Sequence, residues 1–262
     1  MKLIWKLLIG LFASICGALI AQKIGIPLPW TLGPLLTVAS CRLLSLPVAS
    51  ATSLRNAGQW VIGITLGLYF TPQVVAVVTS HWFAMVAGLL FALLLAVYGT
   101  CLLLKLGHAD LRTAWFSSAI GGANEMSILA ERYGVRPDLV ASAHTVRIII
   151  VVLAVPFACQ FFGVSGLDTA ILVQKDFHFN GFLKIGLLTF LGGFVAHKMK
   201  IPNAWVLGSM FIVMFFTMNQ IHFSTVPAEL TLLAQLFIGW SLGDRFRAGF
   251  FKKSPKFLMC VV

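Results

Sequence analysis

The sequence predicts an all-α membrane protein with about eight transmembrane helices, one broken or re-entrant segment, and an inverted-repeat, transporter-like architecture whose second repeat is incomplete. Composition is the first observation behind this prediction. Hydrophobic residues make up 59% of the 262 residues, charged residues only 10%, and the mean hydropathy is +0.96. A soluble protein of this length needs more polar surface than such a chain can supply. The expected solvent is therefore a lipid bilayer.

An internal duplication is the second observation. A pattern of thirteen positions recurs with seven identities at an offset of 175 residues, and a further match follows in the same order at an offset of 176. Two matches in register argue against coincidence, and such repeats build transporter-like membrane folds. The first match pairs Ala21-x-Lys23-x-x-Ile26-Pro27-x-x-Trp30-x-Leu32-Gly33 with Ala196-x-Lys198-x-x-Ile201-Pro202-x-x-Trp205-x-Leu207-Gly208, and the second pairs Gln59, Ile62, Gly63, Leu66, Gly67 and Phe70 with Gln235, Ile238, Gly239, Leu242, Gly243 and Phe246.

The expected helices follow apolar stretches that carry no formal charge. Several of these stretches reach the roughly 18 to 20 residues that a helix needs to cross about 30 Å of hydrocarbon. The stretch 61–105 yields two helices, because it is interrupted at residues 71–73 and at His81. In chain order the predicted helices are 3–21, 28–46, 56–72, 82–104, 139–163, 182–197, 202–219 and 229–244, with the segment 112–132 kept apart.

Glycines at matching positions predict where helices pack. Gly63-x-x-x-Gly67 and Gly239-x-x-x-Gly243 each place two small residues on one helix face. Small residues at this spacing let two helix backbones approach closely in a membrane. We therefore expect both helices to make close packing contacts.

The basic residues predict the topology. Lysines and arginines are enriched in cytoplasmic loops, so Lys2 and Lys6 place the N-terminus on the cytoplasmic side. The loops that contain Arg55 and Lys105 are expected on the same side. The charge-free stretch 71–80 is expected to be an external loop. If segment 112–132 re-enters on one face, the seven later bases also fall inside, whereas a full span would put all seven outside: Lys198, Lys200, Arg245, Arg247, Lys252, Lys253 and Lys256.

The re-entrant reading makes the duplication an inverted one. Lys23 then lies outside and its counterpart Lys198 lies inside. The expected division of the chain is a first membrane repeat over 1–165, a loop over 166–181, and a second repeat over 182–262. A complete second copy would end near residue 340, so we expect a truncated or frameshifted gene.

A candidate substrate or ion site lies in the segment 112–132. Gly121 and Gly122 weaken a helix, and non-helical backbone at membrane depth is tolerated only beside protein or a water-filled cavity. Asn124 and Glu125 follow directly, and an ionisable group inside the membrane is a functional-site hypothesis by default. The alternative for Glu125 is an interfacial glutamate at the end of a short amphipathic turn.

His144 and Arg147 complete the candidate site. They are three residues apart on the helix expected to begin near Pro137, so they share a face. An isolated charge two to three turns into such a helix is costly unless it is paired or snorkels to the interface. Two arrangements stay open for Arg147, namely an ion pair with Glu125 and a snorkelling side chain.

These motifs resemble one known family. The duplicated Ile-Pro-x-x-Trp-x-Leu-Gly, the stretch Gly121-Gly122-x-x-Glu125-Met126 and the pair His144-x-x-Arg147 are similar to the AbrB family of membrane proteins, also labelled ammonia monooxygenases and unrelated to the soluble DNA-binding regulator of that name. The resemblance covers essentially the whole chain. It implies a multi-pass bacterial inner-membrane protein with an indirect role in regulating gene expression. Family members have proline where this chain has Ile120, and they are longer.

Three functions compete at this stage. Direct binding to DNA would need a helix-turn-helix or another soluble basic module, and none is visible. A monooxygenase would need clustered metal ligands, but the six histidines are scattered singly, so we expect no metal, no cofactor and no catalytic residue. A secondary carrier or membrane sensor fits the repeat and the broken segment. Its expected partners are the lipid bilayer, an unknown small solute or ion, and, as an open alternative to a monomer, a second copy of the chain.

Overall fold

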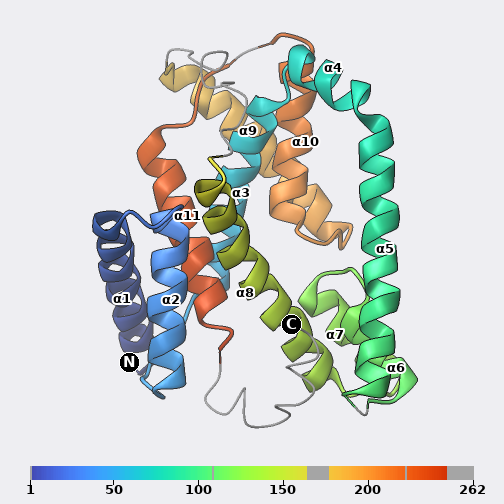
Figure 1. Cartoon of the computed structure of the whole chain (residues 1–262). Coiled ribbons are helices and arrows are strands. Elements are labelled where there is room, and N and C mark those ends of the chain that lie inside the picture. Colours follow the sequence, from blue (N-terminus) through green and yellow to red (C-terminus); the bar gives the residue numbers. More distant parts are fainter. Residues whose placement is uncertain (1, 108, 164–176, 222, 247–262) are drawn as a thin grey trace. The chain divides into compact units, whose positions relative to one another are not determined.

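The protein is helical throughout the part that its structure describes. The computed structural model describes residues 2–107, 109–163, 177–221 and 223–246, apart from the side chains of residues 2 and 123–125. Every regular element within those ranges is a helix, which confirms the all-α class. Figure 1 shows them in chain order: α1 (Lys2–Ile24), α2 (Pro29–Leu43), α3 (Thr52–Tyr69), α4 (Pro72–Ser80), α5 (Trp82–Lys105), α6 (Leu111–Ser118), α7 (Ala123–Arg132), α8 (Pro137–Phe161), α9 (Phe179–Lys198), α10 (Ala204–Met218) and α11 (Ala228–Gly243).

Several of these helices are long and apolar enough to cross a membrane. Four described helices pass this test by length and composition, and α3 with α4 passes it as a bent pair. Helices α10 and α11 are apolar but shorter, at 15 and 16 residues. Each of the eight ranges expected to span contains a helix, so the positions of the expected helices are confirmed, and the apolar helices of spanning length fit a membrane protein. The number of crossings stays a prediction.

One expected loop is a helix. The charge-free stretch 71–80 was predicted to be a loop, but residues 72–80 form α4, which is bent by 80° from α3. Pro72 explains the break, because proline has no backbone N–H to continue α3 and is well placed in the first turn of a new helix. The Thr71 hydroxyl lies 3.4 Å from the backbone nitrogen of Val74, where it accepts a hydrogen bond in that first turn.

The chain divides into two compact units. Unit 1 takes its described residues from Met1–Ser80 and Phe157–Ala248, and unit 2 takes its described residues from His81–Pro156. Unit 1 thus contains α1 to α4, the end of α8, and α9 to α11. Unit 2 contains α5 to α7 and most of α8.

Unit 1 contains two helical hairpins whose connecting turns have the same conformation. Helix α1 packs on α2, and its repeat counterpart α9 packs on α10. Leu28 and Asn203, which correspond in the duplication, both precede their second helix with positive φ angles of 47° and 50°. In each turn the isoleucine of the repeat donates to an alanine carbonyl, at 3.0 Å in the first and 3.1 Å in the second. The duplicated sequence therefore forms the same local structure twice.

The third helix of the first repeat packs on the second repeat. A Cβ placed on Gly63 of α3 would lie 2.5 Å from the Val206 carbonyl oxygen of α10, and one on Gly67 would lie 2.6 Å from Val213 Cβ. Ser209 of α10 also donates its hydroxyl to the Trp60 carbonyl at 3.1 Å. Only glycine leaves room for this approach, so the expected packing role of the first glycine pair is confirmed.

The second repeat makes the reciprocal contact. A Cβ on Gly239 of α11 would strike the Thr31 backbone of α2, and one on Gly243 would lie 2.9 Å from Val38 Cβ. Val38 corresponds to Val213 at the repeat offset, so each glycine pair meets matching residues on the partner repeat. In each repeat of unit 1 the third helix therefore packs on the second helix of the other repeat, α3 on α10 and α11 on α2.

Unit 2 is built around the short helices α6 and α7. Leu103 of α5, Ala114 of α6 and two residues of α8, Ala143 and Val146, form one buried cluster. A further buried cluster consists of Ala130, Val135 and Val140, with Phe116 and Met126 packed against it. Helix α6 is thus held between α5 and α8, and this packing positions the candidate site.

Candidate functional site

The candidate site surrounds a break between two short helices. Helix α6 ends at Ser118 and α7 begins at Ala123. The residues at both edges of the break are not helical, since Ala119 has ψ 149° and Gly122 has ψ 139°. The prediction that segment 112–132 contains a broken helix is therefore confirmed. Its position relative to a membrane stays a prediction.

Asp110 fixes the start of α6. Its carboxylate accepts hydrogen bonds from the Thr113 backbone N–H, at 3.1 Å, and from the Thr113 hydroxyl. This is N-capping, in which a side chain satisfies an N–H group that the first helical turn leaves free. The Thr113 hydroxyl and backbone N–H lower the pKa of Asp110, which lies outside the candidate spans. The carboxylate is therefore charged at neutral pH.

Arg147 of α8 provides hydrogen-bond donors for backbone carbonyls at the C-terminal end of α6. Its Nη2 donates to the Ser117 carbonyl at 2.7 Å, and its Nη1 donates to the Ala119 carbonyl at 3.2 Å. The last four carbonyls of any helix lack partners within that helix, so a cation there is favourable both as a donor and as a charge at the negative end of the helix dipole. The guanidinium thus holds the backbone at the break.

His144 lies one turn before Arg147 and also binds a backbone carbonyl near the end of α6. Its Nε2 lies 2.9 Å from the Phe116 carbonyl, and the side chain is 2% exposed. Because the carbonyl can only accept, the imidazole must donate from Nε2. Two side chains at the predicted spacing on α8 therefore bind carbonyls at the end of α6.

The remaining predicted site residues lie at the break itself. Gly121 packs against the Met126 side chain, and Gly122 precedes the first residue of α7 without any side-chain cap. Asn124 and Glu125 lie in the first turn of α7, but their side chains are outside the described part of the structure. The proposed ion pair between Glu125 and Arg147 therefore stays a prediction. The described partners of the Arg147 guanidinium are the two carbonyls.

Sequence reasoning did not single out Ser117. Its side chain is 0% exposed, and its hydroxyl has no hydrogen-bond partner among the described residues. A buried hydroxyl without a partner costs free energy, on the order of 1–3 kcal/mol. The only sequence signal was its place in the run of small residues before the glycine pair. The site thus combines a guanidinium and an imidazole that bind backbone carbonyls with a buried hydroxyl that has no partner among the described residues.

The described residues offer no ready-made metal site. No group of three histidine, cysteine, aspartate or glutamate side chains lies close enough to hold a metal ion within the described ranges. The side chain of Glu125 is outside those ranges, so metal binding at the break is untested.

Comparison with known proteins points to one family. The family model described as "Transition state regulatory protein AbrB" matches residues 30–262. The curated relatives include "Uncharacterized protein YhjN" of Bacillus subtilis (strain 168), which is 26% identical over 263 residues, covering 91% of this chain and 68% of the relative. They also include "Putative regulator AbrB" of Escherichia coli (strain K12), which is 24% identical over 226 residues, covering 84% of this chain and 64% of the relative.

The match therefore covers only part of each relative. The chain spans about two thirds of the length of these two proteins. No solved structure matches it.

Proposed function

The chain belongs to the AbrB family, and from this premise we propose that it is a multi-pass protein of the bacterial inner membrane that acts as a secondary carrier or solute sensor. Its solute site would lie at the break between α6 and α7. The observation that carries the proposal is the bonding of Arg147 to two backbone carbonyls at that break. Broken helices with satisfied backbone groups are where membrane carriers place their substrates and ions.

The chemistry of the break supports a small polar solute. The Ser117 hydroxyl is buried beside the break and has no hydrogen-bond partner among the described residues, so a bound solute could supply one. In this proposal Glu125, in the first turn of α7, is the group that binds or exchanges a proton or cation. His144 and Arg147 position the backbone around the solute.

Two contact registers in unit 1 support an inverted arrangement of the repeats. Gly63 of α3 contacts Val206 of α10, and Gly67, one turn later, contacts Val213. Contacts therefore advance along both helices together, so α3 and α10 run in the same direction. By the same reasoning α11 runs in the same direction as α2. The start of α3 lies beside the end of α11, because Ser50 binds Asp244, so α3 runs opposite to α11 and α2.

The hairpins complete this argument. Gly17 of α1 meets Gly33 of α2, and the Ala13 carbonyl accepts from Thr37 at 3.1 Å, so α1 and α2 are antiparallel. Helices α9 and α10 are related in the same way. Counterpart helices of the two repeats would then point to opposite faces of the membrane.

The topology is tested by labelling single cysteines at positions 23 and 198 from each side of the membrane. We expect position 23 to react with an impermeant maleimide from outside and position 198 from inside. Labelling of both positions from the same face would rule out the inverted arrangement. The site proposal would survive that result, because it depends only on unit 2.

The carrier proposal is tested by flux. The protein would be reconstituted into liposomes that contain a pH-sensitive dye and exposed to panels of small anions, cations and amino acids. We expect one solute class to drive proton movement, and we expect Glu125→Gln to abolish it. Glu131→Gln is the matched control, because it makes the same chemical change at the other end of α7. Flux that is unchanged in Glu125→Gln would remove this site.

Regulation of gene expression would then be indirect. The name of the E. coli relative describes a regulator, and the described structure is helical and apolar. In this proposal a change in the concentration of the carried or sensed solute produces the regulatory effect. The alternative label, a membrane monooxygenase, has no supporting group of ligands among the described residues.

A further inference from the structure

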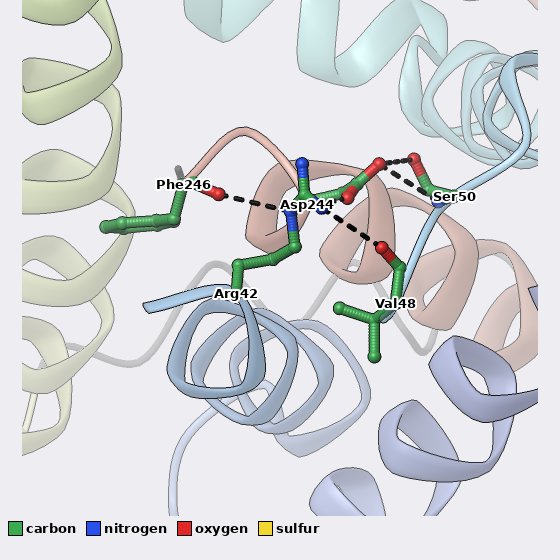
Figure 2. Close-up of polar contacts among 5 residues, drawn as sticks. All are labelled: Arg42, Val48, Ser50, Asp244 and Phe246. Carbon is green, nitrogen blue, oxygen red and sulfur yellow. Dashed lines mark hydrogen bonds and ion pairs between the residues drawn. The ribbon is translucent and has the colours of Figure 1, made fainter. Parts of the chain in front are cut away.

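One end of unit 1 is closed by charged and polar side chains. Nε of Arg42, in the last turn of α2, lies 3.2 Å from Oδ1 of Asp244, which directly follows α11. Oδ2 of Asp244 accepts hydrogen bonds from the backbone N–H of Ser50 at 2.9 Å and from its hydroxyl at 2.8 Å. Figure 2 shows these three residues, which we call the charged clasp, joining the loop before α3 to the ends of α2 and α11.

The clasp also organises the backbone around it. Arg42 donates to the Val48 carbonyl at 3.2 Å and to the Phe246 carbonyl at 3.3 Å (Figure 2). Helix α3 has no side-chain cap of its own, and the Asp244 carboxylate binds Ser50, two residues before the helix begins, near the helix end where a negative charge is favourable. A residue from the end of one repeat thus stabilises the start of a helix in the other.

The clasp is half-buried, so the ion pair between Arg42 and Asp244 can separate and form again. The Arg42 and Asp244 side chains are 31% and 21% exposed, so water can reach the pair once the surrounding contacts loosen. A fully buried ion pair would be costly to separate, whereas a fully exposed one would contribute little. This pair lies between these limits.

Among the described residues, the equivalent end of the duplication shows no such ion pair. The positions that correspond to Arg42, Ser50 and Asp244 are Thr217, Thr225 and Leu68, which carry no charge. Leu68 instead packs with Phe223 against a buried cluster of Ile64, Ile185 and Val213. The two ends of a pseudo-symmetric unit are therefore closed by different physical forces, charge at one end and apolar burial at the other.

We propose that the charged clasp is a gate, which opens its end of unit 1 while the apolar end stays closed. The inference rests on the proposed function, since a carrier or sensor must change between two conformations as it works. Loss of the Arg42 and Asp244 attraction removes the ion pair that ties the end of α2 to the end of α11. Among the described residues, the apolar end shows no ion pair that salt or a partner could release.

The chain provides a natural probe for this opening. Cys41 is half-buried and packs against the cluster of Val38, Val48 and Trp240 directly beside Arg42. The corresponding residue at the apolar end is Phe216, also half-buried, which packs edge-to-face on Phe223. A cysteine at position 41 and one introduced at 216 therefore report on the two ends from matched positions.

The test measures cysteine alkylation in membranes with a permeant maleimide. One protein keeps Cys41 as its only cysteine, and the other has all native cysteines replaced and carries Phe216→Cys. We expect Asp244→Asn to raise the alkylation rate at position 41 by about fivefold or more and to leave position 216 unchanged. We expect salt at about 1 M to accelerate alkylation of Cys41 in the parent protein but not in Asp244→Asn, because the interaction that salt screens is already absent there.

Two results would overturn the proposal. One is an unchanged rate at position 41 in Asp244→Asn, and the other is an equal increase at both positions, which would indicate general loosening. If Asp244→Asn elutes as an aggregate, Arg42→Gln and the salt response of the parent protein decide the question by the same criteria. Alkylation needs no solute, so the gate can fail while flux persists, and flux can fail while the gate is supported.

Discussion

The Arg147 guanidinium donates a hydrogen bond to the Ser117 carbonyl at 2.7 Å, across thirty positions of sequence. This contact ties α8 to the end of α6, and the neighbouring bond to Ala119 extends it into the non-helical break. A charged side chain in an apolar helix is thereby supplied with acceptors without requiring a carboxylate. The same contact gives the break one defined shape.

Replacing Arg147 should therefore destabilise the protein. We expect Arg147→Met to lower the free energy of unfolding by about 2 kcal/mol, because hydrogen bonds from a charged group contribute roughly 1.5–3 kcal/mol. Arg147→Lys should recover only part of this, since a lysine cannot reach two carbonyls with one planar fork. Thermal unfolding in detergent, followed by size-exclusion chromatography, provides the measurement. Arg136→Met, which removes an exposed ion pair with Asp138, is the control and should have little effect.

The two glycine contacts should be equally sensitive to substitution. Gly63→Ala and Gly239→Ala each place a methyl group against the backbone of the partner helix, and overpacking of this kind costs about 1–3 kcal/mol. Gly88→Ala is the matched control, because a Cβ there meets nothing within 4 Å and alanine favours the helix. Detergent melting curves of the three variants decide the matter. A large loss in only one of the two repeats would contradict the matched packing.

The two repeats should not fold independently. Because α3 packs on α10 and α11 packs on α2, a fragment of residues 1–163 lacks the packing partners of two of its helices. We expect this fragment to be degraded when expressed alone and to accumulate when co-expressed with residues 177–262. Immunoblotting of membrane fractions measures both levels. Stable, monodisperse accumulation of the isolated fragment would show that the exchanged contacts are dispensable.

Acid should weaken the cap of α6. The pKa of Asp110 is lowered in the folded protein, so its contribution to stability is present above the ordinary carboxyl pKa of 3.8 and is lost as the pH falls through the folded value. We expect Asp110→Asn to be less stable than the parent protein at neutral pH and the difference to shrink below about pH 4. Melting curves at a series of pH values provide the test. A constant difference down to pH 2 would indicate that the carboxylate charge plays no part.

Much of the fold could be predicted from local sequence. Apolar stretches between charges marked the helices, and the glycine pairs marked close contacts, because both signals act within a few turns of one helix. Residues 72–80 were missed because a loop and a short apolar helix after proline share the absence of charge. The break at Gly121 and Gly122 was predicted because glycine weakens any helix locally.

The candidate site could be predicted only in part. Spacing showed that His144 and Arg147 share a face of α8, but their partners are backbone carbonyls, which every residue carries and which leave no mark in the sequence. The charged clasp was missed for a related reason. Arg42 and Asp244 are ordinary charges near helix ends, and only packing brings them within 3.2 Å.

The sequence alone determined that this chain is apolar, helical, duplicated and interrupted at one glycine pair, since these properties follow from composition and short-range pattern. The tertiary structure decided which helices meet. Ser209 and Trp60 bond across 149 residues, and Ser50 and Asp244 across 194 residues. Such pairings depend on how whole helix faces fit together, and a face is complementary to its partner only once both helices are formed and packed.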